Sequence, residues 1–454
     1  MYRKNIWESA DSKKMTAIME FNKPYIEFLS KGKTERECVV QSIALAEIAG
    51  FKPLDSFKEL KAGDRVYVLN KNKNIALFII GKKPLKEGMR ILGAHIDSPR
   101  LDLKQNPLYE KDGFALLDTH YYGGVKKYQW VTIPLALHGV VCKKDGTTVM
   151  VNIGDNEDDP VLGIGDLLIH LSQDQLAKTA AKVIEGENLD VTIGSIPLKE
   201  DEKFSVKANV LKLLKEKYGM EEDDFVSSEI EVVPAGNARD YGLDRSMVAS
   251  YGQDDRVCAY TSLRAILDVK DPEYTSCCIL VDKEEIGSVG ATGAHSLFFE
   301  NTVARLLAKL GDHDFLSVRE TMENSYMLSS DVSAGVDPLF ESVNEMKNAA
   351  FMGEGIVFNK YTGSRGKSGC NDTNPEFIAW LRKILDDENI HYQTAELGRV
   401  DAGGGGTIAY ILGNYNMNVI DAGVGVLNMH APMEISSKAD VYEAYLSYVA
   451  FLTK

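Results

Sequence analysis

Two adjacent glutamates, Glu284 and Glu285, follow an apolar run at residues 278–281 and precede a glycine-spaced stretch. The apolar run predicts a buried strand, so the two carboxylates stand at a strand end. Neighbouring carboxylates repel each other, and burying either one as an ion is costly unless a cation pairs with it. The segment therefore raises the question of which cation binds there.

Other segments also carry aspartate or histidine at the end of an apolar run or at the start of a helix. These residues are His95 with Asp97, Asp254, Asp331 and His430. Each of them also fits a structural role, such as a hydrogen-bonded pair, a helix start or cap, or a satisfied core histidine. The set is more informative, because sites in open α/β sheets form beyond the carboxyl ends of the strands. Two divalent cations would balance these carboxylates, with one glutamate as a ligand and its neighbour as a base toward water.

The composition is that of a globular protein and excludes several classes of partner. With 454 residues the chain is long enough for two or three domains. Its 51 basic and 67 acidic residues give a net charge of −16. This charge argues against nucleic acid or an anionic membrane as a principal partner.

The cysteine pattern and the amino-terminal segment both predict a cytoplasmic location. The six cysteines are scattered and form no CxxC motif, which favours reduced thiols over a zinc ribbon or a redox motif. The first residues are polar and mixed in charge, unlike a signal peptide. No run of about 18 apolar residues is present to span a bilayer.

The pattern along the chain predicts an α/β protein with an insertion. Apolar residues at three-to-four spacing predict helix in the first 50 residues, and short β-rich runs follow. Between about residues 100 and 250, strand-like pieces, an acidic loop and a charged helix replace this pattern. Helices then alternate with buried strands to the end, which predicts a sheet covered by helices on both faces.

Six segments in this order resemble the aspartyl-aminopeptidase-like family of two-metal aminopeptidases, and the resemblance covers most of the chain. They read YIEFLSKGKTERECV, AHIDSPRLDLK, EIEVVPAGNARDYGLDRSMVASYGQDDR, DKEEIGSVGATGA, SSDVSAGVDP and GVLNMHAPMEISSKADV. The resemblance implies a zinc-peptidase fold of the phosphorylase/hydrolase type, with a mixed sheet flanked by helices. It divides the chain into a discontinuous catalytic domain, 1–100 and 250–454, and an inserted, mainly-β dimerisation domain, 101–249.

The resemblance also implies a ligand set for two divalent ions. The ions are expected to be zinc, and cobalt or manganese can occupy such sites. His95 and Asp331 would hold one ion, Glu285 and His430 the other, and Asp254 would bridge them.

Four further expectations rest on the resemblance. Glu284 is expected to be the general base, and Asp97 the carboxylate that orients the histidine of the first ion. The peptide bond between Asp254 and Asp255 is expected to be cis. The segment IGDLLIHLSQDQ is similar to one that reaches into the active site of a neighbouring subunit, so His170 is a candidate for transition-state stabilisation in trans. The alternative for His170 is an ordinary surface histidine on a helix.

The chain departs from the family pattern at two places. Acid-specific members carry a lysine in an I-K-x-N segment, and Phe358 is placed at this lysine in GIVFNKYTG. Lys360, Arg365 and Lys367 are candidates to substitute for it, so acidic and apolar or broad preferences both stay open. At 132–135, TIPL replaces a charged part of the family's insertion.

The expected function is removal of amino-terminal residues from peptides that have a free amino terminus. The expected assembly is a homo-oligomer, a dimer-built tetrahedral dodecamer. Two alternatives stay open, a two-metal deacylase or carboxypeptidase on the same scaffold and a catalytically silent shell. The silent shell would be expected to have lost a base or a ligand, whereas each of these positions is filled here.

Overall fold

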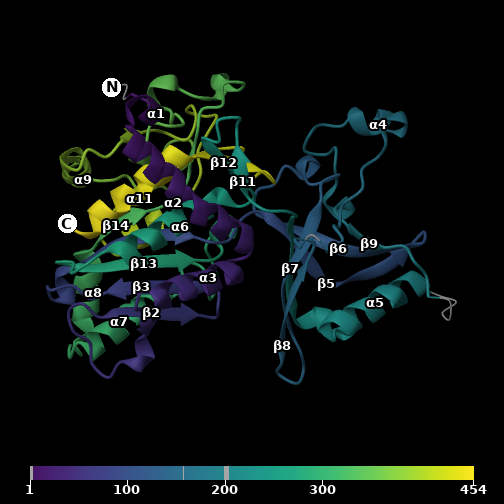
Figure 1. Cartoon of the computed structure of the whole chain (residues 1–454), viewed down its shortest axis with the longest axis horizontal. Helices are drawn as coiled ribbons and strands as arrows, with labels where there is room; N and C mark the ends of the chain where they lie inside the picture. The colour runs from purple at the N-terminus through teal and green to yellow at the C-terminus, as the bar shows by residue number, and fades with distance from the viewer. Residues whose placement is uncertain (1–3, 157, 199–203) are drawn as a thin grey trace. The chain divides into compact units, whose positions relative to one another are not determined.

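The computed structural model describes residues 4–156, 158–198 and 204–454 (Figure 1). The chain forms two compact units, which are described separately. The first unit comprises residues 1–97, 238–429 and 433–454, and the second comprises residues 98–237 and 430–432.

A nine-stranded mixed sheet forms the centre of the first unit. Its order is β1-β2-β3-β13-β4-β14-β18-β16-β17. The four central strands, β13, β4, β14 and β18, run parallel, whereas β3 and β16 are antiparallel to their inner neighbours. The bounds are β1 (Lys52–Pro53), β2 (Arg65–Asn70), β3 (Asn74–Ile79), β4 (Met89–His95), β13 (Thr275–Val281), β14 (Tyr326–Ser329), β16 (Ile356–Asn359), β17 (Tyr392–Thr394) and β18 (Asn418–Gly423).

Helices cover both faces of this sheet, as predicted. Strand β13 explains the sequence pattern, because Cys278 and Leu280 pack into the core on one face and Cys277, Ile279 and Val281 into the core on the other. A strand buried on both faces is apolar without alternation. The first core includes α2 (Ser12–Lys31), α3 (Glu35–Ile48), α6 (Gln253–Asp268), α9 (Pro375–Asp387) and α11 (Lys438–Leu452). The second includes α7 (Phe298–Lys309), α8 (Phe315–Glu323) and α10 (Ala409–Gly413), and α1 (Ile6–Ser9) precedes α2.

A small five-stranded sheet completes the first unit and leads into the site. Its order is β11-β12-β20-β19-β15. Strand β12 runs directly into helix α6, which begins three residues later. The bounds are β11 (Arg239–Tyr241), β12 (Met247–Ser250), β15 (Ser333–Ala334), β19 (Gly425–Leu427) and β20 (Glu434–Ser437).

The second unit is built on a six-stranded antiparallel sheet. Its order is β8-β7-β10-β5-β6-β9. The amphipathic helix α5 buries Val206 and Val210, and an added Cβ at Gly194 of β9 would meet Val210, so α5 lies against the sheet. The bounds are β5 (Arg100–Lys111), β6 (Phe114–Tyr122), β7 (Leu135–Cys142), β8 (Thr148–Ile153), β9 (Val191–Gly194), β10 (Ser228–Pro234), α4 (Gln173–Leu176) and α5 (Ser205–Tyr218).

None of the described helices combines the length and the apolar composition that crossing a membrane requires.

Candidate metal centre

Three parallel strands bring their carboxyl ends together in the first unit. His95 is the last residue of β4, which lies between β13 and β14. Val281 at the end of β13 pairs with His95, and Ser329 at the end of β14 pairs with Gly93. The turn after β13 carries Glu284 and Glu285, and Asp331 follows β14 by two residues. The spacing along each strand therefore delivers all four side chains to one edge of the sheet.

Asp254 reaches this edge from the start of α6. Its backbone angles are not helical (φ −83°, ψ 105°), and neither are those of Asp255. The peptide bond between these two aspartates is cis, as predicted. The backbone N–H of Asp254 donates to the buried carboxylate of Glu434 at 2.9 Å. Glu434 was not singled out from the sequence, where only its position four residues after His430 connects it with the site.

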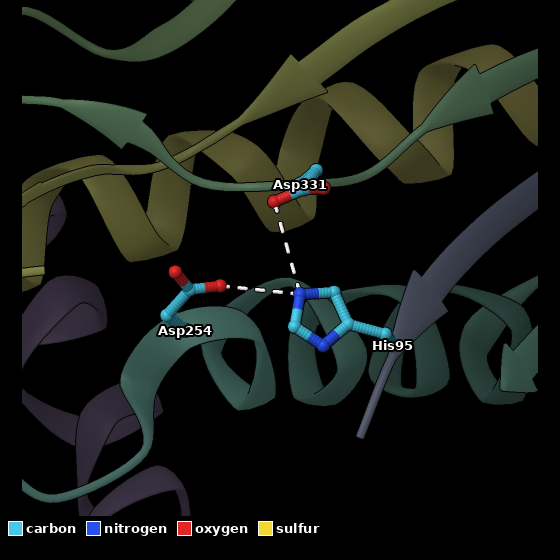
Figure 2. Close-up of side chains that lie close together, drawn as sticks. All are labelled: His95, Asp254 and Asp331. Carbon is cyan, nitrogen blue, oxygen red and sulfur yellow. Dashed lines mark ion pairs between the residues drawn. The ribbon is translucent and has the colours of Figure 1, made fainter. Parts of the chain in front are cut away.

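Figure 2 shows His95, Asp254 and Asp331 pointing toward one another from strand β4, the start of helix α6 and the loop after β14. The His95 Nε2 atom lies 3.1 Å from Asp254 Oδ1 and 3.9 Å from Asp331 Oδ1. All three side chains are buried. Ligand atoms of the three residues lie within 4.8 Å of one another. The same is true of His95 with Glu284 and Glu285, and of Asp254 with Glu285.

Asp97 connects His95 with the turn after β13 that carries Glu284 and Glu285, here called the glutamate turn (residues 282–292). The His95 Nδ1 atom lies 3.3 Å from the Asp97 carboxylate and 3.0 Å from its backbone carbonyl. The two carboxylate oxygens of Asp97 accept the backbone N–H groups of Glu284 at 3.1 Å and of Glu285 at 3.2 Å. Orientation of His95 was predicted from the resemblance, whereas the support of the turn emerges only from the structure.

The electrostatics of the cluster fit a divalent cation. Burial raises the pKa of Asp331 well above its ordinary value, and the nearby Asp255 carboxylate raises it further. Burial lowers the pKa of His95, but hydrogen bonds to Asp254 and Asp97 outweigh it and leave this pKa well above its usual range. These groups would share protons to relieve the crowding of carboxylates. A dication would relieve it instead, by binding ionised carboxylates and a neutral imidazole. The mixed nitrogen and oxygen donors suit zinc, cobalt or manganese.

His430 lies in the turn between β19 and β20, within the three residues that group with the second unit. Its φ of 68° is in the left-handed region. The Nδ1 atom lies 2.9 Å from the carbonyl oxygen of Gly124, also in the second unit. When Nδ1 donates to this carbonyl, Nε2 carries the lone pair that a metal ligand needs.

His170 lies in the second unit, on the short 3-10 helix Ile169–Leu171. It is exposed, and so are the apolar side chains beside it. Leu168 is 54% exposed, Ile169 69% and Leu171 68%. The structure of the single chain thus presents His170 within a patch of exposed apolar residues, here called the 168–171 patch.

The I-K-x-N comparison needs a correction. Phe358 is buried in the core between sheet and helices, with its ring 5.9 Å from that of Tyr392. The neighbouring Val357 faces the other side of the sheet, in a cluster with Ala350 and Ala395. When the pattern is anchored on Ile356 and Asn359, its lysine falls on Val357 rather than on Phe358. The position still lacks a positive charge.

Residues 28–452 match the model of the family described as aminopeptidase I zinc metalloprotease (M18). The chain belongs to the M18 family. A probable M18 family aminopeptidase 1 of Clostridium acetobutylicum is 59% identical over 99% of this chain and 98% of that protein. The crystal structure of an M18 aminopeptidase from Thermotoga maritima shares 46% identity, covers all of both chains and superposes with a TM-score of 0.96. That of aminopeptidase I from C. acetobutylicum shares 57% identity, again over the whole of both chains, with a TM-score of 0.94.

Membership of the M18 family establishes the class of reaction. This chain is a metal-dependent aminopeptidase, a hydrolase that acts on peptides, and its family is one of zinc enzymes. The mixed α/β fold agrees with that of these relatives.

Proposed function

We propose that this aminopeptidase binds two divalent ions, zinc in the first place, at the carboxyl ends of β4, β13 and β14. The ligands are His95, Asp254, Glu285, Asp331 and His430. The observation that carries the proposal is the convergence of His95, Asp254 and Asp331, whose ligand atoms lie within 4.8 Å of one another in a buried cluster that holds two carboxylates. Cobalt or manganese are the alternative ions.

Zinc bound there would acidify a water molecule and polarise the scissile carbonyl. Glu284 lies beside the ligands without being needed as one, because its neighbour Glu285 offers an oxygen within 4.8 Å of Asp254. We assign Glu284 as the general base, which takes a proton from the attacking water and passes it to the leaving amine. Asp97 orients His95 and holds the turn through two N–H groups.

We further propose that the two units have different roles. The first unit is catalytic, and the second, predicted from the sequence as 101–249, assembles copies of the chain. The exposed 168–171 patch supports this division, because burying it against another copy would remove apolar side chains from water. His170 would then reach a neighbour's active site and stabilise the transition state in trans. The assembly would be a dimer-built tetrahedral dodecamer, as the family resemblance implies.

The proposed location is the cytoplasm, since all six cysteines are free thiols. The peptide panel below decides the preferred first residue, because Val357 is buried in a core cluster and Lys360, Arg365 and Lys367 stay candidates for the positive charge.

The test is hydrolysis of a peptide panel by wild type, by Glu284→Gln and by the control Glu27→Gln. Glu27 is an exposed residue of helix α2 that pairs with Lys31. The panel varies the first residue among acidic, apolar and basic types and includes amino-blocked copies, and bound zinc is counted for each protein. Wild type and the control should release the first residue of free peptides only. Glu284→Gln should keep its zinc and lose about 10²–10⁴-fold in kcat.

Faster cleavage of the blocked peptides would favour a deacylase in place of an aminopeptidase. A Glu284→Gln variant as fast as wild type would remove the proposed base.

A further inference from the structure

The tip of the β2–β3 hairpin places a buried cation close to the glutamate turn. Residues 71–73 connect the two strands, and Lys71 and Asn72 turn the chain with φ values of 52° and 57°. Lys71 is exposed, but Lys73 is only 8% exposed. A buried ammonium group is costly unless charged partners surround it.

Two carboxylates that pair with Lys73 are fully buried. Its Nζ atom lies 2.8 Å from Glu35 Oε1, at the start of α3, and 3.5 Å from Asp282 Oδ2. Asp282 directly follows β13 and stands two residues before Glu284. The ion pair therefore joins the hairpin to the first residue of the turn that carries the proposed base.

The β2–β3 hairpin also contacts the other end of this turn, at residues 291–292. The Thr292 hydroxyl donates to Asp282 Oδ2 at 2.6 Å, and the Asp282 N–H donates to the Thr292 carbonyl at 3.3 Å. The Asn74 amide donates to the same carbonyl, and the Asn70 amide donates to the carbonyl of Ala291 at 2.7 Å. The residues that close the turn at both ends thus contact one hairpin.

Between Asp282 and Thr292, hydrogen bonds to Asp97 and within the turn itself hold the glutamates. Asp97 accepts the N–H groups of Glu284 and Glu285, and the Lys283 carbonyl accepts the N–H of Ser288 at 2.7 Å. The glutamates are consequently fixed between Asp97 on β4's side and the β2–β3 hairpin.

We propose that the β2–β3 hairpin positions the general base of this enzyme, with Lys73, Asp282 and Thr292 as positioning residues for Glu284. The inference rests on the proposed role of Glu284. These residues act on the rate by holding Glu284 within hydrogen-bond reach of the water. A displacement of about 1 Å at such a group costs about 100-fold in rate, even when the mutated residue lies away from the chemistry.

Three variants test the inference. Thr292→Val removes the hydroxyl and keeps the shape of the side chain, and Lys73→Met removes the cation. Lys71→Met is the matched control, because it changes an exposed lysine of the same turn. We measure kcat, KM, bound zinc and, in the metal-free proteins, backbone amide exchange of residues 283–292.

The expected loss of kcat is about 10-fold for Thr292→Val and about 100-fold for Lys73→Met, with KM and bound zinc near wild type. Amide exchange of the turn should rise in both variants, and Lys71→Met should match wild type throughout. Wild-type kcat and exchange in a folded Thr292→Val and Lys73→Met would overturn the inference. A loss of kcat that merely follows a loss of zinc would also overturn it. If Lys73→Met does not fold, Thr292→Val decides.

A wild-type protein without metal-dependent peptidase activity would contradict the proposed function instead. The exchange of the metal-free proteins would still show whether the hairpin holds the turn.

Discussion

The two units differ in the burial of the side chains proposed to act in catalysis: three proposed metal ligands of the first unit are buried, whereas His170 of the second unit is exposed. His95, Asp254 and Asp331 are buried at the ends of elements that the core holds in place. His170 sits on a short 3-10 helix within the exposed 168–171 patch. The fold of the first unit positions these buried ligands, whereas the proposed ligand His430 groups with the second unit. The role proposed for His170 requires a neighbouring copy of the chain.

Removal of the metal should have the largest effect, and it should affect the two units differently. A chelator is expected to abolish activity and to speed amide exchange in β4 and β14, because ligand binding stabilises the folded state that holds it. Exchange in β7 and β10 of the second unit should stay unchanged. Added zinc should restore both activity and protection. Equal changes in the two units would contradict a metal centre whose buried ligands His95, Asp254 and Asp331 belong to the first.

Substitution of His170 should have the next largest effect. His170→Ala is expected to lower kcat by about 10²–10³-fold, as for loss of one transition-state hydrogen bond, and to leave bound zinc unchanged. The matched control is His120→Ala, another exposed histidine of the second unit.

Mixing the two inactive variants tests whether His170 acts in trans. Co-refolded His170→Ala and Glu284→Gln chains should regain activity, because one neighbour supplies His170 to a site with an intact Glu284. Mixtures that stay inactive while forming mixed oligomers would show that His170 does not work across subunits.

Substitution of Asp97 should have the smallest effect of the three and tests how far the first unit depends on support around its ligands. Asp97→Asn has one oxygen where the N–H groups of Glu284 and Glu285 need two acceptors. We expect kcat/KM or zinc affinity to fall by about 10–100-fold. Asp112→Asn, on an exposed turn of the second unit, is the control. Full activity and zinc binding in Asp97→Asn would show that the ligands hold their positions without it.

Much of the first unit follows from local patterns. The uninterrupted apolar run before Glu284 predicts a strand buried on both faces, and β13 is such a strand. The placement of His95, Glu285 and Asp331 at strand ends then predicts that they meet, because parallel strands share an edge. Family resemblance added the cis peptide bond after Asp254, which the structure confirms.

The orientation and the long-range contacts of several other side chains cannot be predicted from a short stretch of sequence. Phe358 and Val357 are neighbours on β16 and face opposite sides of the sheet, but the uninterrupted apolar run does not show which side each one faces. Nothing in the sequence distinguishes Lys73 from the other lysines of its polar turn, and nothing distinguishes Glu434 from an ordinary strand residue. Their buried contacts with Asp282 and with the Asp254 N–H depend on packing between distant segments.

The sequence by itself determined which side chains stand at strand ends and, by resemblance, which chemistry they serve. Periodicity and chain order carry this information, since each strand brings its own terminal residues. The tertiary structure alone decided which hydrogen bonds and ion pairs fix those side chains in position. Asp97 and Glu284 are 187 residues apart, and their hydrogen bond exists only because β4 and β13 pair in parallel. Such contacts depend on register and burial, which no short stretch of sequence specifies.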